Sequence, residues 1–197
     1  MSVQRIIGVC GLNASGKSTV CNFYKNKGFI VISLSDIIRQ TLKERNVSET
    51  RDNLINLGNE LRNKSGAGVL ANLTIEKLNQ NSNYVIDSIR HPDEVNSFRN
   101  KFNENGKKIF NLIGIDSSAE TRFERTQSRK RQGDTTTLEE FMSVEKREMN
   151  NPDPNGQQVS KVLEMCDYKI LNNLDQTLDG LLNDLNDLEN ILIKKVV

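Results

Sequence analysis

The chain has 197 residues, enough for one domain with a sizeable hydrophobic core. Its formal net charge is +1 and aromatic residues make up only 5% of it, so neither a basic track nor a stacking platform for nucleic acid is expected. The three cysteines lie far apart, the single histidine completes no zinc-like cluster, and no stretch approaches the ~20 apolar residues of a membrane span. We therefore expect a cytoplasmic protein without a nucleic-acid or membrane partner.

The N-terminal half begins with an apolar run at residues 5–10, whose length and β-branched content predict a buried strand. Residues 17–27 then predict a helix that ends at Gly28, and a second strand is expected at residues 29–34. Three helices are expected next, at about residues 36–46, 51–63 and 67–79.

The C-terminal half continues the same alternation of strands and helices. A third strand at residues 84–87 precedes a helix at 91–102, and a fourth at 109–115 precedes a helix at 117–130. The remaining elements are, in chain order, a helix at residues 138–149, a short helix after the 150–155 turn, a strand at 168–171 and a final helix rich in Leu and Asp.

Strands separated by helices predict a parallel sheet that is covered on both faces. We therefore expect a single α/β domain over residues 1–197, with a five-stranded parallel sheet in a three-layer α/β/α arrangement. In such a fold, ligands bind beyond the carboxyl ends of the strands.

One motif lies where the first strand meets the first helix. Residues 11–19, GLNASGKST, match the P-loop pattern GxxxxGK[ST] in full. The glycines let the backbone wrap so that N–H groups point at phosphate oxygens, Lys17 can reach the β- and γ-phosphates, and Ser18 is the expected Mg²⁺ ligand. The motif predicts a P-loop NTPase fold and a site for ATP and Mg²⁺ formed by Gly11, Asn13, Ala14, Ser15, Gly16, Lys17, Ser18 and Thr19.

Asp87 ends the apolar run at residues 84–87 and places a carboxylate at the tip of a strand. Such an Asp can hold the water shell of the metal or orient an acceptor hydroxyl. We assign Asp87 to catalysis, together with Lys17, and to metal binding, together with Ser18. Capping of the next helix is the alternative role.

Arginines gather in residues 121–134. Arg122, Arg125 and Arg129 have the spacing i, i+3, i+7 and share one helical face. Transfer of a phosphoryl group needs stabilisation of charge, which small P-loop kinases provide with arginines from a mobile lid. The cluster favours such a lid, at about residues 125–140, over a solvated basic face that pairs with Glu124 and Glu145.

A second group of charged residues suggests where an acceptor binds. Asp36 and Arg39 begin the helix after the second strand, and Arg62 and Arg90 occur later in the chain. Arginine forks suit an acceptor phosphate, because they bind it bidentately. Simple capping of a helix is the alternative for Asp36. His91 is expected at the surface, at the start of a helix, rather than in contact with substrate.

The order and spacing of these motifs resemble those of the archaeal adenylate-kinase-related proteins, which are nucleoside-monophosphate-kinase-like P-loop proteins similar to dephospho-CoA kinase. The resemblance covers nearly the whole chain and rests on residues 8–19, 33–39, 60–62, 85–90, 121–125 and 167–172. One departure is Ser88, where family members usually carry Gly.

The resemblance implies ATP and Mg²⁺ as cofactors and a helical acceptor-binding insertion at about residues 35–80. It also implies that Arg125 and Arg131 are catalytic lid residues and that residues 166–173 lie near the adenine. The acceptor-binding residues that it implies are Asp36, Arg39, Arg62 and Arg90.

The leading hypothesis is a nucleoside or deoxynucleoside monophosphate kinase, which transfers the γ-phosphoryl group of ATP to a small nucleotide acceptor. Dephospho-CoA kinase is the alternative enzyme, although it typically lacks the Asp-x-Ile-Arg element after the third strand. An ATP-binding regulator with slow hydrolysis and a protein partner is the alternative from another class. The sequence leaves the oligomeric state open.

Overall fold

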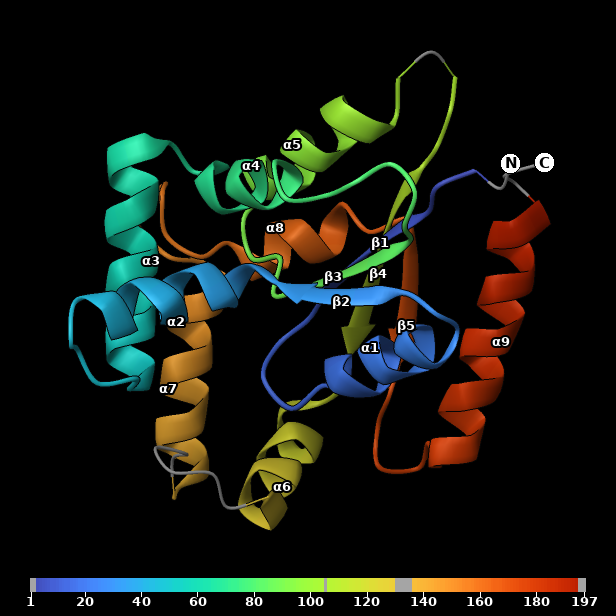
Figure 1. Cartoon of the computed structure of the whole chain (residues 1–197). Coiled ribbons are helices and arrows are strands. Elements are labelled where there is room, and N and C mark those ends of the chain that lie inside the picture. Colours follow the sequence, from blue (N-terminus) through green and yellow to red (C-terminus); the bar gives the residue numbers. More distant parts are fainter. Residues whose placement is uncertain (1–2, 105, 130–135, 195–197) are drawn as a thin grey trace.

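The computed structural model describes residues 3–104, 106–129 and 136–194. Five strands form one parallel sheet in the order β2-β3-β1-β4-β5 (Figure 1). The five-stranded parallel sheet expected from the sequence is thus confirmed. The strands are β1 Ile6–Cys10, β2 Ile30–Ser33, β3 Tyr84–Asp87, β4 Phe110–Asp116 and β5 Tyr168–Leu171.

Helices connect the strands and cover both faces of the sheet. Within the described residues they are α1 Lys17–Asn26, α2 Leu34–Glu44, α3 Arg51–Ser65, α4 Val69–Ile75, α5 Pro92–Phe102, α6 Ala119–Arg129, α7 Leu138–Met149, α8 Val159–Glu164 and α9 Leu178–Lys194. None of these helices is both long and apolar enough to span a membrane.

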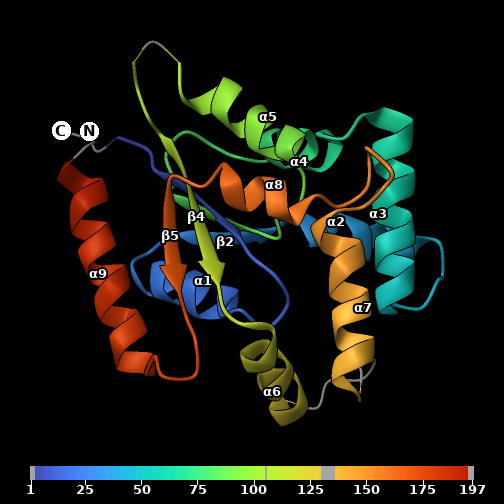
Figure 2. The ribbon, with the colours of Figure 1, turned by 180° about the vertical axis from the view of Figure 1, so that it is seen from behind.

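The central strand β1 has core on both of its faces, as its continuous apolar sequence requires. Ile7 and Val9 pack in one cluster with residues of α1 and α9, whereas Ile6 and Cys10 pack in the other with residues of α2, α4, α5 and α8. The molecule therefore has three layers, with the sheet between α1 and α9 on one side and α4, α5 and α8 on the other (Figures 1 and 2).

The carboxyl ends of the strands point toward α6 and α7, which lie beyond the edge of the sheet (Figure 2). Because β1 and β3 are hydrogen-bonded neighbours, the loops that follow them start side by side, with Gly8 opposite Ile86. The P-loop and Asp87 therefore share one edge of the sheet, where ligands bind in open α/β folds.

Some element boundaries differ from the sequence expectation. The predicted helix at 67–79 is shorter, because α4 ends at Ile75, and α2 begins at Leu34 because Ser33 caps it. The second strand expected at residues 29–34 is present as β2, which lies at the edge of the sheet and leaves Ile30 and Val31 exposed. Of the predicted lid, residues 130–135 and therefore Arg131 lie outside the described residues.

Candidate functional site

The P-loop connects β1 to α1, and its glycines are required by the backbone. Gly11 and Gly16 have φ of 147° and 114°, a region that L side chains rarely adopt. A Cβ atom on Gly11 would collide with the carbonyl oxygen of Ile115, and one on Gly16 would collide with the Asn172 side chain. The loop therefore passes close to the ends of β4 and β5, with no room for larger residues.

The N-terminus of α1 is available to an anion. No described side chain caps this helix, and its first turn carries no acidic residue. The first N–H groups of a helix lack partners inside the helix, and they lie at the positive end of its dipole. This is the geometry that binds phosphate oxygens.

Lys17 lies partly buried at the start of α1, and its Nζ donates a hydrogen bond to the Leu12 carbonyl at 2.7 Å. Burial lowers its pKa to about 8, and the positive charge of Arg90 acts in the same direction. Asp87 and Glu148 partly oppose this shift. The lysine is thus a cation in surroundings that favour its neutral form, and a bound anion would relieve that conflict.

Asp87 has one carboxylate oxygen that lacks a hydrogen-bond partner among the described residues. Its Oδ1 is buried without a hydrogen-bond partner among the described residues, and its Oδ2 accepts from the Ser88 hydroxyl at 3.3 Å. An unsatisfied carboxylate oxygen beside a P-loop fits a hydrated Mg²⁺ ion, for which Ser18 at the exposed start of α1 offers a hydroxyl ligand. Ser88 has φ of 66°, a conformation in which the Gly usual in the similar family would be less strained.

Three arginines of α6 have different surroundings. Arg122 is buried and forms a bidentate pair with Glu145 of α7, with N–O distances of 2.8 and 2.6 Å. The pairing with Glu145 is the one in the alternative for this cluster, but a buried Arg122 does not belong to a solvated face. Arg125 instead reaches the P-loop, 3.5 Å from the carbonyl oxygens of Ala14 and Ser15. Arg129 donates to Asn13 Oδ1 at 3.2 Å. Two of the three arginines therefore contact the P-loop.

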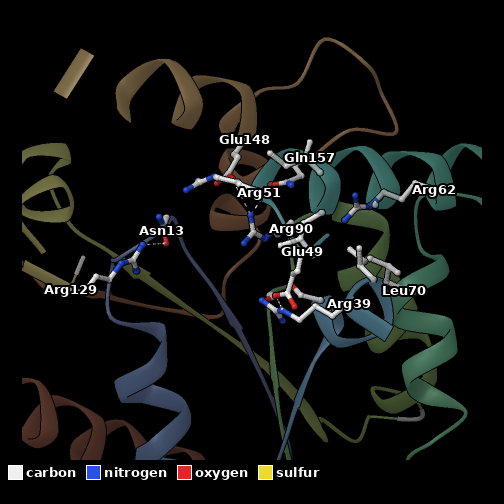
Figure 3. A pocket seen from close by; sticks show the side chains of 16 residues that line it. Asn13, Arg39, Glu49, Arg51, Arg62, Leu70, Arg90, Arg129, Glu148 and Gln157 are labelled. Atoms are coloured by element: carbon white, nitrogen blue, oxygen red, sulfur yellow. Dashed lines mark hydrogen bonds and ion pairs between the residues drawn. The ribbon is translucent and has the colours of Figure 1, made fainter. Parts of the chain in front are cut away.

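A cavity of about 280 Å³ lies on one side of the P-loop, between α2, α3 and the end of β3 (Figure 3). Among the described residues, five arginines line it, and Arg90 occupies the centre of the view in Figure 3. Charged residues in its wall are Arg39, Arg51, Arg62, Arg90, Arg129, Glu49 and Glu148. This excess of positive charge suits an anionic ligand.

The four residues predicted to bind an acceptor do not all contribute equally to this cavity. Arg39 and Arg90 line it. Arg62 also lines it, but its Nε and Nη2 donate to the buried carboxylate of Glu94 at 3.3 and 2.9 Å. Asp36 is not among the lining residues: it is exposed, it accepts from the Ser33 N–H at 3.4 Å and it pairs with Arg39. Its position supports helix capping rather than acceptor binding.

Three further residues that line this cavity were not predicted from the sequence: Arg51, Glu148 and Gln157. Arg51 Nη2 donates to Glu148 Oε1 at 2.8 Å, and Arg90 Nη1 donates to Gln157 Oε1 at 2.9 Å. Burial raises the pKa of Glu148, but Arg90 and Arg51 outweigh it, so the pKa lies below its usual value. The helical spacing of Phe141, Glu145 and Glu148 could have indicated that both glutamates are buried, because the three residues fall on the same face of α7.

His91 begins α5, as expected, and accepts from the Asp93 N–H at 3.1 Å. The expectation that it is a surface residue is wrong, because it is only 6% exposed. Its Nε2 lies 2.9 Å from the Pro154 carbonyl oxygen, so the turn that follows α7 covers it. The same segment holds Arg90 in place, because the Gln158 N–H donates to the Arg90 carbonyl at 2.8 Å.

A second cavity, of about 310 Å³, lies on the other side of the P-loop. Ala14, Arg125 and Asn172 line it, and Leu178 and Leu181 of α9 form an apolar part of its wall. Asn172 Nδ2 donates to the Ser15 carbonyl at 2.8 Å and so ties the end of β5 to the P-loop. Arg129 lines both cavities.

Comparison with known sequences finds a matching family model and related proteins. A family model described as an AAA domain matches residues 10–142. The chain is 34% identical to a UPF0200 protein of Pyrococcus horikoshii, over 85% of this chain and 88% of the relative. It is 32% identical to a UPF0200 protein of Methanoculleus marisnigri, over 86% and 87% of the two chains.

Solved structures with the same fold include kinases. A shikimate kinase from Bacteroides thetaiotaomicron superposes with a TM-score of 0.55 at 14% identity, covering 94% of this chain and 98% of that one. A gluconokinase from Sinorhizobium meliloti superposes with a TM-score of 0.51 at 16% identity, covering 98% and 99%. At these identities the likeness concerns the fold alone, which is the α/β fold of P-loop kinases.

Proposed function

The chain belongs to the UPF0200 family, and we propose that it is an ATP- and Mg²⁺-dependent phosphotransferase acting on a nucleoside or deoxynucleoside monophosphate. The observation that carries the proposal is the pair of cavities on opposite sides of the P-loop, with Arg129 in the wall of both. A phosphotransferase needs two adjacent sites, one for the donor and one for the acceptor, that meet at the transferred phosphoryl group.

We assign the cavity beside α9 to the donor. The N–H groups of the P-loop and the start of α1 would bind the phosphates, and Leu178 and Leu181 offer apolar surface to the adenine. Ser18 and Asp87 would hold Mg²⁺, which, when bound, neutralises charge on the phosphates.

We assign the arginine-rich cavity to the acceptor. Arg39 and Arg90 would bind the acceptor phosphate, because both line the cavity and neither donates two hydrogen bonds to a buried carboxylate, as Arg62 does to Glu94. Arg62 would contribute mainly to the shape of the wall. Leu54, Ile55 and Leu70 supply an apolar part of the wall on which a base or sugar can pack.

In the transfer step, an oxygen of the acceptor attacks the γ-phosphorus and ADP leaves. Lys17 and Arg125 would stabilise the negative charge that develops on the transferred group, because both lie at the P-loop. Arg129, and Arg131 in the undescribed part of the predicted lid, would help to exclude water, which otherwise competes as acceptor.

The experiment that tests this proposal is a measurement of ADP release from ATP and Mg²⁺ with ribo- and deoxynucleoside monophosphates and dephospho-CoA as acceptors. We expect strong stimulation by a nucleoside monophosphate, with the phosphorylated product seen by mass spectrometry. Stimulation by dephospho-CoA alone would assign the enzyme to that substrate instead. Slow hydrolysis that no acceptor changes would overturn the proposal in favour of an ATP-binding regulator.

A further inference from the structure

Glu148, the penultimate residue of α7, lines the arginine-rich cavity and has one buried carboxylate oxygen without a hydrogen-bond partner. The residue is only 3% exposed. Its Oε1 accepts from Arg51 at 2.8 Å and lies 3.4 Å from Arg90 Nη1, whereas its Oε2 is buried with no hydrogen-bond partner among the residues that the structure describes. Figure 3 shows the carboxylate above Arg51 and Arg90.

Glu145, one turn earlier on the same helix, provides a comparison. Both of its oxygens are satisfied, because Arg122 donates Nε to Oε1 and Nη2 to Oε2. Glu145 lines neither of the two cavities, whereas Glu148 lines the arginine-rich one. The two buried carboxylates of α7 therefore differ: both oxygens of Glu145 are paired with Arg122, whereas Oε2 of Glu148 has no hydrogen-bond partner among the described residues.

The negative charge of the Glu148 carboxylate limits which groups its unpaired Oε2 can bind. Arg90 and Arg51 keep Glu148 charged at neutral pH, and a charged carboxylate only accepts hydrogen bonds. Leaving such an oxygen buried and unpaired is unfavourable, so its natural partner is an O–H or N–H group. A second anion at this point would be repelled.

We infer that Glu148 recognises a neutral hydroxyl or amino group of the acceptor, beside the anionic group that Arg39 and Arg90 hold. The inference rests on the proposed function, because it assumes that this cavity binds the acceptor. It narrows the acceptor to molecules that carry an anion and a hydrogen-bond donor together. In a nucleotide, the donor is a ribose hydroxyl, an amino group of the base or a ring N–H of the base.

The test measures binding rather than turnover. The tightest binder among AMP, GMP, CMP and UMP is compared, by calorimetry with a non-hydrolysable ATP analogue present, with its 2′-deoxy and 3′-deoxy forms. It is also compared with base analogues in which an exocyclic amino group is replaced by hydrogen or a ring N–H is methylated. We expect the wild-type protein to bind one of these analogues about tenfold more weakly than the parent. Glu148→Gln should weaken binding of the parent by a similar factor and abolish that discrimination. The analogue that is affected shows whether sugar or base supplies the donor.

Two variants separate recognition from support of the fold. Arg51→Gln breaks the same ion pair but leaves Oε2 in place, so it should keep the discrimination between parent and analogue. Glu60→Gln removes an equivalent charge from an exposed pair with Arg45 and should change nothing. Thermal melting of each variant, with and without nucleotide, reports whether it is folded.

Three results would overturn the inference. The first is a wild-type protein that binds all the analogues as tightly as the parent; the second is an equal loss of discrimination in Arg51→Gln and Glu148→Gln. The third is an absence of binding by all four monophosphates. Turnover in parallel samples, with ATP and Mg²⁺ in place of the analogue, tests the proposed function separately: discrimination in binding without phosphoryl transfer would refute the kinase assignment but keep the role of Glu148.

Discussion

Lys17 lies partly buried near Arg90, and its pKa falls from the ordinary value of 10.5 to about 8. An unfolded chain would therefore bind more protons at this site than the folded one between pH 8 and 10.5. The free energy of unfolding then rises with pH across that window, and at pH 7 the charged lysine destabilises the fold. A residue that is unfavourable for folding but suited to binding phosphate indicates a functional role.

We predict opposite effects on activity and stability for Lys17→Met. Turnover should fall at least about a hundredfold, because the charge that stabilises the transferred group is lost. The melting temperature at pH 7 should rise, because an unfavourable buried charge is removed, and the gain should shrink as the pH increases from 8 toward 10.5. Melting curves and ADP release measure both; Lys25→Met, on the exposed face of α1, is the control. Unchanged turnover would refute the role of Lys17.

Arg39 and Arg62 line the same cavity, but substitutions should affect different properties. Arg62→Ala leaves Glu94 buried without its partner, which should cost about 3–5 kcal/mol of stability. Arg39 pairs with Asp36 and Glu49 at an exposed position, so Arg39→Ala should cost at most about 1 kcal/mol. It should instead raise the acceptor KM about tenfold, through loss of a charged hydrogen bond. Denaturant titration and steady-state kinetics distinguish these effects, and an unchanged acceptor KM would remove Arg39 from the site.

At the scale of whole elements, α6 carries two arginines with different surroundings within one turn. Arg122 joins α6 to α7 through Glu145, and Arg125 points to the P-loop. Arg122→Met should lower the melting temperature markedly, because Glu145 remains buried and charged. Arg125→Met should keep the melting temperature and lower kcat roughly a hundredfold, with little change in the KM for ATP. If Arg122→Met and Arg125→Met change the melting temperature and kcat in the same way, the assignment of different roles to these two arginines is incorrect.

Most of the elements could be predicted, because short apolar runs and amphipathic stretches have clear periods. The P-loop motif also located the junction of β1 and α1. The partners of individual arginines could not be predicted: the spacing of Arg122, Arg125 and Arg129 defines a helix face, but the position of α7 decides which of them meets a carboxylate. Glu148 was missed for the same reason, since its partner Arg51 is 97 residues away in sequence.

At the scale of the whole molecule, one cavity lies on each side of the P-loop, at the edge of the sheet. Residues from both ends of the chain meet there, as the bond from Asn172 to Ser15 shows. Solved kinases share this fold at 14–16% identity. A fold that is kept while most residues change leaves substrate choice to the cavity walls, so in this chain we expect the acceptor to be decided by α2, α3 and the end of α7.

The most direct test follows the γ-phosphoryl group itself. ATP labelled with ¹⁸O in the γ-phosphoryl group is incubated with the protein and the nucleoside monophosphates, and mass spectrometry locates the label. We predict that the label appears in a nucleoside diphosphate, that little of it appears in inorganic phosphate, and that both products vanish in Lys17→Met. Label found only in inorganic phosphate, at a rate that no acceptor changes, would contradict phosphoryl transfer between the two cavities.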